Sequence, residues 1–136
     1  MTPKEIAIKV MWAKLDMPYL WRGDDPLAGF DCSGGVIEAL KSAGKLPGRG
    51  DWTAAGLFPK FKQVDTPAEG CLVFWGKTAD GIYHVEMCLD ETFSIGFSGG
   101  NSETLTEAEA IKQNAYCKVR PFRNRPGIYG FVDPFV

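Results

Sequence analysis

Cys32 and His84 are the residues of this chain whose chemistry best fits nucleophilic catalysis. Cys32 stands where a glycine-containing loop meets a segment with helical spacing, and Ser33, Gly34 and Gly35 follow it. At such a place the free backbone amides and the helix dipole favour a thiolate, so the pattern predicts a lowered pKa for Cys32. The small residues after it would let a substrate backbone approach the sulfur. The alternative is that Cys32 only fills space in the core.

His84 is the only histidine in the chain, so any Cys–His mechanism must use it. Imidazole has an ordinary pKa of about 6.5, which suits it to take the thiol proton and return it to a leaving amine. If Glu86 lies close in space, its charge would favour the imidazolium and an ion pair with the thiolate. A lone histidine in a strand-like segment can also be a half-buried packing residue.

The first third of the sequence predicts helices that would place Cys32. Thr2-Pro3-Lys4-Glu5 forms a capping box, and it predicts a helix over about residues 3–15. The apolar residues at helical spacing behind it are expected to face the core: Ile6, Val10, Ala13 and Met17, widened by Ile8, Trp12 and Leu15. A second helix is predicted from about Cys32 to Ala43, with Asp31 or Ser33 near its N-terminus.

From residue 71 onward the apolar pattern becomes that of strands. Residues 71–75 are continuously apolar, which is typical of a buried strand. The other elements expected are a short helix over about 53–58, a hairpin of 82–89 and 93–97, a helix over about 106–114, and closing strands over 116–120 and 128–132. Helices followed by an antiparallel sheet predict an α+β fold, in one domain over residues 1–136.

Composition narrows the function classes. With 136 residues, 45% hydrophobic and 24% charged, the chain matches a globular protein and excludes wholesale disorder or a coiled-coil rod. The net charge of −2 disfavours a general nucleic-acid binder, and no apolar stretch is long enough for a membrane span. Acidic residues gather between residues 77 and 112 and basic ones from 112 to 125. We interpret these as two solvated faces; the alternative is a basic surface for an anionic polymer.

The cysteines give no metal or disulfide signature. The four are widely spaced, at positions 32, 71, 88 and 117, and with one histidine they match no usual zinc-ligand spacing. Cys71 and Cys88 lie inside apolar runs and are expected to be buried structural residues. Nothing in the sequence calls for a metal or an organic cofactor.

Three blocks of sequence resemble the NlpC-type cell-wall cysteine peptidases, a papain-like bacterial family. They lie in the family's order between residues 18 and 98: Pro18-Tyr19-Leu20-Trp21-Arg22-Gly23 with Gly29-Phe30-Asp31-Cys32-Ser33-Gly34-Gly35-Val36, then Pro67-Ala68-Glu69-Gly70-Cys71-Leu72-Val73-Phe74-Trp75, then His84-Val85-Glu86-Met87. The resemblance implies a papain-like NlpC fold, in which the helix of the nucleophile packs on an antiparallel sheet.

The resemblance also implies an activity and a site. The chain would hydrolyse amide bonds in peptidoglycan stem peptides, near γ-D-glutamate, with Cys32 and His84 catalytic. Tyr19 would help hold the substrate or the oxyanion. Substrate-binding residues are expected among Asp31 and Ser33, which would hold a free amine of the stem, and Trp21 and Arg22, the latter for a carboxylate.

The sequence departs from the family at a position that matters. About twelve residues after the catalytic histidine the family usually has a His, Asn or Gln that orients it, and here Gly96 stands there. Ser98 or Asn101 would supply the third polar residue after a register shift, or a water or backbone carbonyl would. Arg22 also replaces one glycine of the family's Trp-Gly-Gly.

Two rival functions stay open. One is an amidase or acyltransferase that uses the same Cys–His dyad. The other is a structural or binding module of a phage particle that has lost activity, and Gly96 is the feature that favours it. With no signal peptide in view, we expect synthesis in the cytoplasm and action on the bacterial cell wall. That combination suggests a phage endolysin or a virion module with phage tail proteins as partners.

Overall fold

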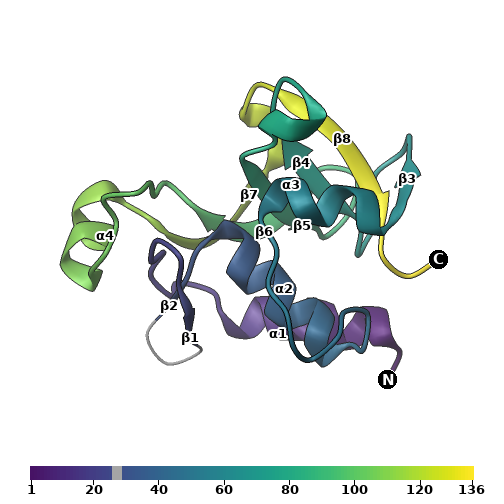
Figure 1. Cartoon of the computed structure of the whole chain (residues 1–136), viewed down its shortest axis with the longest axis horizontal. Coiled ribbons are helices and arrows are strands. Elements are labelled where there is room, and N and C mark those ends of the chain that lie inside the picture. Colours follow the sequence, from purple (N-terminus) through teal and green to yellow (C-terminus); the bar gives the residue numbers. More distant parts are fainter. Residues whose placement is uncertain (26–28) are drawn as a thin grey trace.

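A six-stranded antiparallel sheet with two helices on one face forms the body of the protein (Figure 1). The computed structural model describes residues 1–25 and 29–136, and Pro26 lies outside them. The helices described are α1 Pro3–Ala13, α2 Cys32–Ser42, α3 Ala54–Leu57 and α4 Glu107–Gln113, with short 3-10 turns η1 Phe58–Lys60, η2 Ala79–Gly81 and η3 Phe122–Asn124. The expected α+β arrangement is confirmed.

The strands of the large sheet pair in the order β3-β8-β4-β5-β6-β7. Their bounds are β3 Lys62–Val64, β4 Leu72–Trp75, β5 His84–Cys88, β6 Phe93–Ser98, β7 Tyr116–Pro121 and β8 Ile128–Asp133; β1 Asp24–Asp25 and β2 Gly29–Phe30 form a separate ribbon. The predicted hairpin is β5 with β6, and the closing strands are β7 and β8. β3 was not predicted, because its residues are mostly polar and exposed at the sheet edge.

Strand β4 is buried on both faces, as its continuous apolar run predicts. Leu72 and Phe74 face the cluster formed with α1 and α2, whereas Val73 and Trp75 face a second, smaller cluster on the opposite side of the sheet. Trp75 is paired with His84 across the β4–β5 ladder. The side chain of His84 therefore lies on the same side of β5 as Trp75, at the end of the sheet where β5 begins.

Helix α1 follows its capping box, and Ile6, Ile8, Val10 and Met17 pack against the core as expected, but the most deeply buried positions are others and Ala13 is exposed. Thr2 and Glu5 make both reciprocal hydrogen bonds of the box. The buried residues are Ala7, Met11 and Lys14, whereas Trp12 is 45% exposed. Apolar residues lie around most of this helix, so periodicity alone could not select the buried side. Packing against α2 selects it, and the expectation that Trp12 and Leu15 widen the core face is wrong.

Helix α2 lies unusually close to its neighbours because Gly34 and Gly35 have no side chains. A Cβ on Gly34 would overlap the carbonyl oxygen of Gly23, and one on Gly35 would lie 2.7 Å from the Phe97 ring in β6. Both glycines are buried. They therefore serve packing, and the expectation that they open a path for a substrate backbone is wrong.

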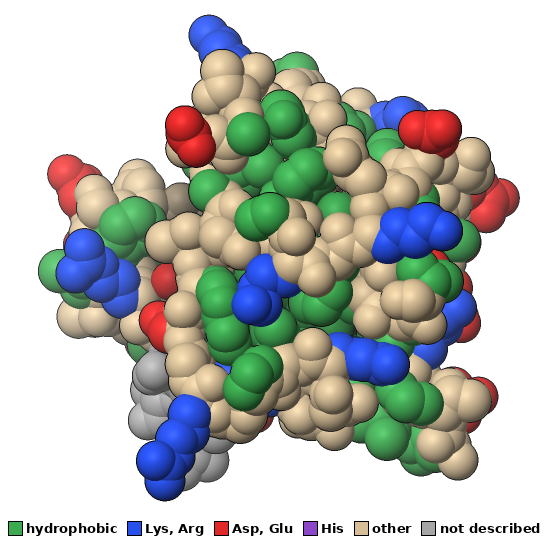
Figure 2. Space-filling view, turned by 45° about the vertical axis from the view of Figure 1, so that its right-hand side comes forward, with side chains coloured by type: hydrophobic (Ala, Val, Ile, Leu, Met, Phe, Trp, Pro, Cys, Tyr) green, Lys and Arg blue, Asp and Glu red, His purple; other side chains and the backbone are tan. Residues whose placement is uncertain are grey.

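Charged side chains are dispersed among hydrophobic and other side chains over the face seen in Figure 2. Among the described residues, no helix has the length and apolar character needed to cross a membrane. All four cysteines are free, and Cys71, Cys88 and Cys117 are buried, which confirms the structural reading of the first two.

Gly35→Ala is expected to lower the free energy of unfolding by about 1–3 kcal/mol, because the added Cβ overpacks the contact with Phe97. Alanine forms helices better than glycine, so helix propensity alone would raise the free energy of unfolding. A decrease therefore indicates that packing dominates. Urea denaturation measures the change. Gly48→Ala is the control, since nothing lies near its Cβ position, and an equal loss in both variants would contradict the packing argument.

Candidate active site

Cys32 is the first residue of α2, where the helix reaches the start of β5. Its side chain is half-buried, and Sγ donates a hydrogen bond to the Tyr83 carbonyl oxygen over 3.9 Å. Tyr83 is the residue immediately before His84. The fold therefore brings together the helix start and the strand start that carry the two predicted catalytic residues.

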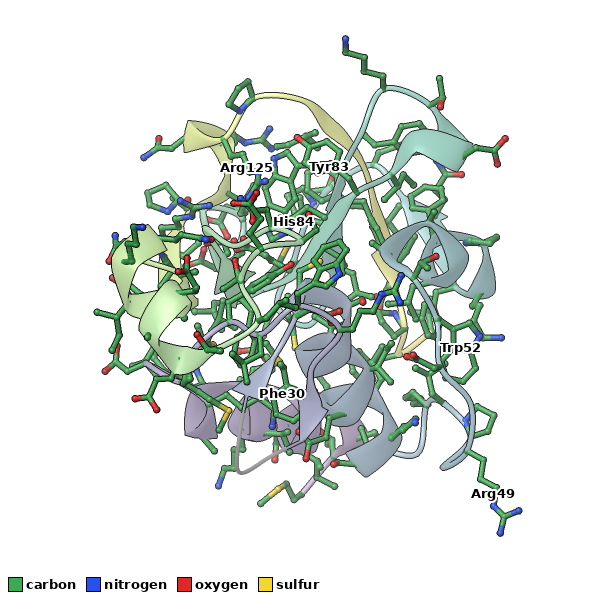
Figure 3. The ribbon with its side chains drawn as sticks, turned by 60° about the vertical axis from the view of Figure 1, so that its left-hand side comes forward. Phe30, Arg49, Trp52, Tyr83, His84 and Arg125 are labelled. Carbon is green, nitrogen blue, oxygen red and sulfur yellow. The ribbon has the colours of Figure 1, made fainter. Side chains whose placement is uncertain are left out.

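His84 is the first residue of β5 and its side chain is almost fully buried. The imidazole packs on the Trp75 indole with 5.0 Å between ring centroids, and the indole N–H donates to the Arg125 carbonyl oxygen over 3.0 Å. The guanidinium of Arg125 lies 5.5 Å from the Tyr83 ring centre, and Figure 3 shows the three side chains of Tyr83, His84 and Arg125 grouped together. The imidazole is thus held on one side by an aromatic wall.

The polar partner of His84 is Glu86. The distance from His84 Nε2 to Glu86 Oε2 is 2.6 Å, and Ser94 Oγ donates to Glu86 Oε1 over 2.8 Å. Arg120 lies 4.0 Å from the same carboxylate, which is only 1% exposed. The sequence placed Glu86 among acids on a solvated face; in the fold this acid is buried, because alternation along β5 puts it on the same side as His84.

The two residues expected to orient His84 have other surroundings. Ser98 Oγ is buried and has no hydrogen-bond partner among the described residues. Asn101 belongs to a local turn: its backbone N–H donates to Thr104 Oγ1, and its side-chain oxygen accepts from the Glu103 N–H. Neither is hydrogen-bonded to His84 in the part of the chain described; the side chain that is hydrogen-bonded to it there is Glu86.

The site disfavours charge on the sulfur. Burial, with added repulsion from Asp31 and Glu86, raises the pKa of Cys32 to about 12. The expectation of a lowered Cys32 pKa is therefore wrong while His84 is neutral. Burial and the two carboxylates raise this pKa by more than the free amides at the start of α2 lower it. Burial also lowers the pKa of His84, against the opposing effect of Glu86.

Glu86 is the charged member of the pair. Burial alone would raise the pKa of Glu86, but the hydrogen bonds from His84 and Ser94 and the charge of Arg120 bring it below its ordinary value. An ionised carboxylate can only accept hydrogen bonds, so Nε2 of His84 must carry a proton and donate it to Glu86 in a hydrogen bond. The other ring nitrogen, Nδ1, is then the one without a proton in the neutral ring.

Tyr19 lies beside the sulfur with its phenol protonated. The ring is buried and lies against Gly100, where any Cβ would overlap it. Burial, then repulsion from Cys32 and Asp31, raises the pKa of Tyr19 above its ordinary value. At neutral pH the hydroxyl is therefore a hydrogen-bond donor, as the predicted oxyanion role requires.

A pocket of about 410 Å³ opens beside the N-terminus of α2. It gathers the predicted residues Arg22, Asp31 and Ser33 with residues from another loop, Asp51, Trp52 and Thr53. Trp21 is 38% exposed and does not line it. Asp51 was missed by the sequence analysis, since no motif marks an exposed loop acid.

Asp31 has a structural task in this pocket. Its Oδ1 accepts the Gly34 N–H over 2.7 Å and the Ser33 hydroxyl over 3.4 Å, so it caps α2 as predicted. Burial raises the pKa of Asp31, and the nearby Asp51 carboxylate adds to the rise. Arg22 adopts a left-handed backbone with φ of 58°, a conformation that costs little only for glycine.

A second pocket, of about 510 Å³, flanks the site near Arg120. It is lined by Gly99, Gly100, Arg120, Asn124, Arg125 and Pro126. The first pocket thus offers two carboxylates and the Arg22 guanidinium, and the second offers two guanidinium groups.

Comparison with known proteins identifies the family. The profile of the NlpC/P60 family matches residues 16–121, which is most of the chain. The chain belongs to the NlpC/P60 family. The bifunctional muramidase/DL-endopeptidase CwlT of Bacillus subtilis (strain 168) is 40% identical over 70 residues, covering 50% of this chain and 21% of CwlT. The match therefore spans about a fifth of that relative.

Solved NlpC/P60 structures share the fold. The P60 domain of antigen MAP1204 from M. avium subspecies paratuberculosis has a TM-score of 0.75 at 23% identity, covering 98% of this chain and 96% of that one. RipD of Mycobacterium tuberculosis, described as a non-catalytic NlpC/p60 domain protein adapted to peptidoglycan binding, has a TM-score of 0.71 at 17% identity, covering 98% and 97%. These likenesses confirm the expected papain-like fold.

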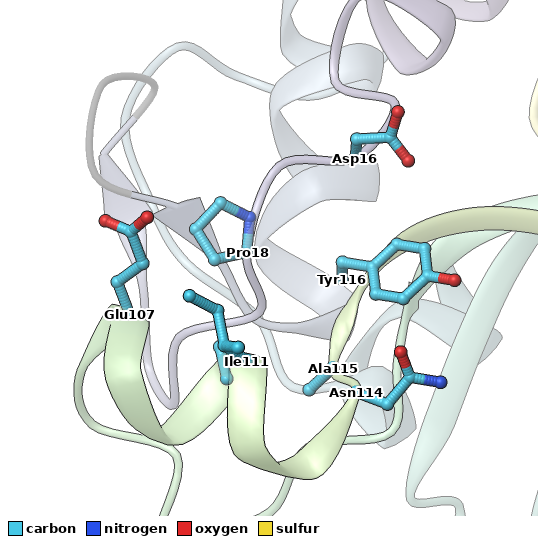
Figure 4. A pocket seen from close by; sticks show the side chains of 8 residues that line it. Asp16, Pro18, Glu107, Ile111, Asn114, Ala115 and Tyr116 are labelled. Atoms are coloured by element: carbon cyan, nitrogen blue, oxygen red, sulfur yellow. The ribbon is translucent and has the colours of Figure 1, made fainter.

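A third pocket in this NlpC/P60 chain lies apart from the cysteine and histidine (Figure 4). It has a volume of about 300 Å³ between α4 and the segment after α1, and its lining includes Asp16, Pro18, Glu107 and Ile111. It contains none of the residues predicted for catalysis. The candidate active site is therefore the meeting point of α2 and β5 at Cys32 and His84, with the pockets at Asp31 and at Arg120 near it.

At neutral pH, iodoacetamide is expected to alkylate Cys32 selectively, because the other three cysteines are buried. His84→Ala should slow this reaction at least about tenfold, since the thiol then loses the base that takes its proton and keeps a raised pKa. Peptide mapping by mass spectrometry follows each cysteine. Equal labelling of Cys32 with and without His84 would contradict the pairing.

Proposed function

We propose that this NlpC/P60 chain is a cysteine peptidase that hydrolyses an amide bond in the stem peptide of peptidoglycan. The observation that carries the proposal is a half-buried thiol at the start of α2, hydrogen-bonded to the backbone carbonyl of Tyr83, next in sequence to a buried histidine whose Nε2 is bound to a carboxylate. Such a nucleophile, base and orienting acid is the arrangement that covalent acyl transfer requires.

In the proposed reaction, Cys32 gives its proton to His84 Nδ1 as the sulfur attacks the amide carbonyl carbon. The resulting imidazolium then gives this proton to the departing amine, so the C–N bond breaks and a thioester remains. Water, with His84 again accepting a proton, hydrolyses the thioester and restores the thiol. Glu86 stabilises the transient positive charge on the ring without taking the proton.

The oxyanion formed during attack needs hydrogen-bond donors. The backbone N–H of Cys32 lies in the first turn of α2, where amides have no partner within the helix. The protonated hydroxyl of Tyr19 is the second proposed donor. Both groups are held in place before the substrate arrives, which is the condition for effective electrostatic stabilisation.

The flanking pockets support a stem peptide as the substrate. Asp31 and Asp51 supply negative charge suited to a free ammonium group, while Arg22, Arg120 and Arg125 offer partners for carboxylates. A stem peptide carries both kinds of group. The relative CwlT is named a DL-endopeptidase, which agrees with the proposed cleavage near D-glutamate.

The rival function is a binding module, because RipD has this fold and is described as non-catalytic. Intact Cys32, His84 and Tyr19 favour the peptidase. An amidase or acyltransferase would use the same groups and differ in the bond cut or in the acceptor. The phage setting remains a prediction from the sequence.

Purified peptidoglycan digested with the protein is expected to release fragments with new amine termini inside the stem. Cys32→Ala should abolish the release, because no thioester can form, whereas Cys71→Ala, at a buried cysteine away from α2, should retain it. Mass spectrometry of the fragments names the bond. A folded wild type that releases nothing from several wall types would favour the binding module.

Asp51→Asn is expected to raise KM about two- to fivefold for stems with a free amino end, the effect typical of an exposed ion pair. The same stem with its amine acetylated should show no change, since it carries no charge for Asp51 to attract. Steady-state kinetics on the paired substrates measure this difference, with Asp65→Asn as a control at an exposed acid on another loop. Equal KM changes on both substrates would contradict amine binding.

A further inference from the structure

Glu86 occupies space that Gly96 leaves empty on the neighbouring strand. The pairs Met87–Ile95 and Cys88–Ser94 join β5 to β6, and Gly96 follows beside Glu86. A Cβ on Gly96 would lie 2.5 Å from Glu86 Cγ and 3.0 Å from its Cβ. The side chain of Glu86 therefore lies directly across Gly96, in the position that any side chain at residue 96 would need.

Both oxygens of this carboxylate are engaged. Oε2 meets His84 Nε2 at 2.6 Å, Oε1 accepts from the Ser94 hydroxyl at 2.8 Å, and Arg120 lies 4.0 Å from Oε2. Ser94 is itself fully buried. The carboxylate is therefore fixed in direction from two sides, and it fixes the ring plane of His84 in turn.

We propose that Glu86 is the positioning residue for His84: it accepts the Nε2–H hydrogen bond and leaves Nδ1 as the ring nitrogen available to Cys32. Gly96 is the complementary half of this device, since its missing side chain admits Glu86. This inference rests on the proposed function for the role of His84. In it, the third residue of the site is a carboxylate on β5, the same strand that carries His84.

A charged partner changes the proton balance of the site. When the thiol proton moves to Nδ1, the ring gains a positive charge while its original proton stays on Nε2, next to the carboxylate. A carboxylate 2.6 Å away stabilises that charge far more than a neutral acceptor would. Glu86 thereby lowers the free-energy cost of separating charge between the thiol and the imidazole during the reaction, although burial keeps both groups neutral at rest.

Other charged or titratable groups act on these residues, and an experiment must hold them constant. Around His84 and Glu86 they are Cys32 at the start of α2, Cys88 on β5, Cys117, Lys118 and Arg120 on β7, and Arg125 before β8. Asp31 and Tyr19 act on Cys32.

The first test needs no variant, because the chain has a single histidine. Histidine labelled with nitrogen-15 gives NMR signals from His84 alone. The expected result for the neutral ring is a proton on Nε2, exchanging slowly with water, and none on Nδ1. A neutral ring protonated on Nδ1 would overturn the proposal.

The second test follows the alkylation rate of Cys32 from pH 5 to 10.5 in Glu86→Gln. Glutamine keeps an acceptor for Nε2–H and removes the charge. At pH 7 the rate should fall about tenfold or more, since an adjacent opposite charge is worth one or more pKa units. At alkaline pH the thiolate forms beside a neutral ring and the alkylation rate rises. In Glu86→Gln this rise should begin at a lower pH than in the wild type, because one charge that repels the thiolate is gone.

These opposite changes distinguish positioning of His84 from general damage to the fold. General damage would change the alkylation rate in the same direction at neutral and at alkaline pH. Glu91→Gln, an exposed glutamate in the loop between β5 and β6, is the matched control and should reproduce the wild-type profile. Gly96→Ala, which forces Glu86 aside, should slow the neutral reaction while keeping every charge. If Glu86→Gln or Gly96→Ala leaves the neutral rate unchanged, the proposal is wrong. Neither test uses a substrate, so failure to cleave peptidoglycan would not affect them.

Discussion

The close approach of helix α2 to the sheet is the constraint on which the site depends. The contact of Gly35 with the Phe97 ring sets how near the helix comes, and Cys32 stands one turn before it at the helix start. Because the sulfur must reach the first residue of β5, a wider separation would remove it from the imidazole of His84. Packing inside the core thus determines whether two groups at its edge can exchange a proton.

The same closeness makes the electrostatics demanding. Glu86 and His84 are both buried, and an unpaired charge there would cost several kcal/mol. The pair is tolerated because the hydrogen bond from Ser94 and the charge of Arg120 complete the surroundings of the carboxylate. A neutral resting site, with charge separating only during reaction, is the state that this balance favours.

The sequence predicted the frame well because its signals were local. Caps, apolar runs and turn residues located α1, α2, β4 and the β5–β6 hairpin, and motif order located Cys32 and His84. What failed depended on contacts between elements: the most deeply buried positions of α1, the role of the glycines after Cys32, and the thiol pKa, which two carboxylates from separate segments help to raise. Glu86 was noticed only as an acid near His84, since spacing within one strand cannot reveal that Gly96 on the next strand makes room for it.

The packing of Glu86 over Gly96 ties the histories of two positions together. Consider a lineage in which the polar partner of the histidine moves from residue 96 to residue 86 by two successive substitutions. The intermediate has either both side chains, which overlap, or neither, which leaves the histidine without a hydrogen-bond partner. Both intermediates are impaired, so the two substitutions should be inherited as a pair. In alignments of related chains, a small residue at one position is expected to accompany a polar one at the other, and either column read alone would suggest a defective enzyme.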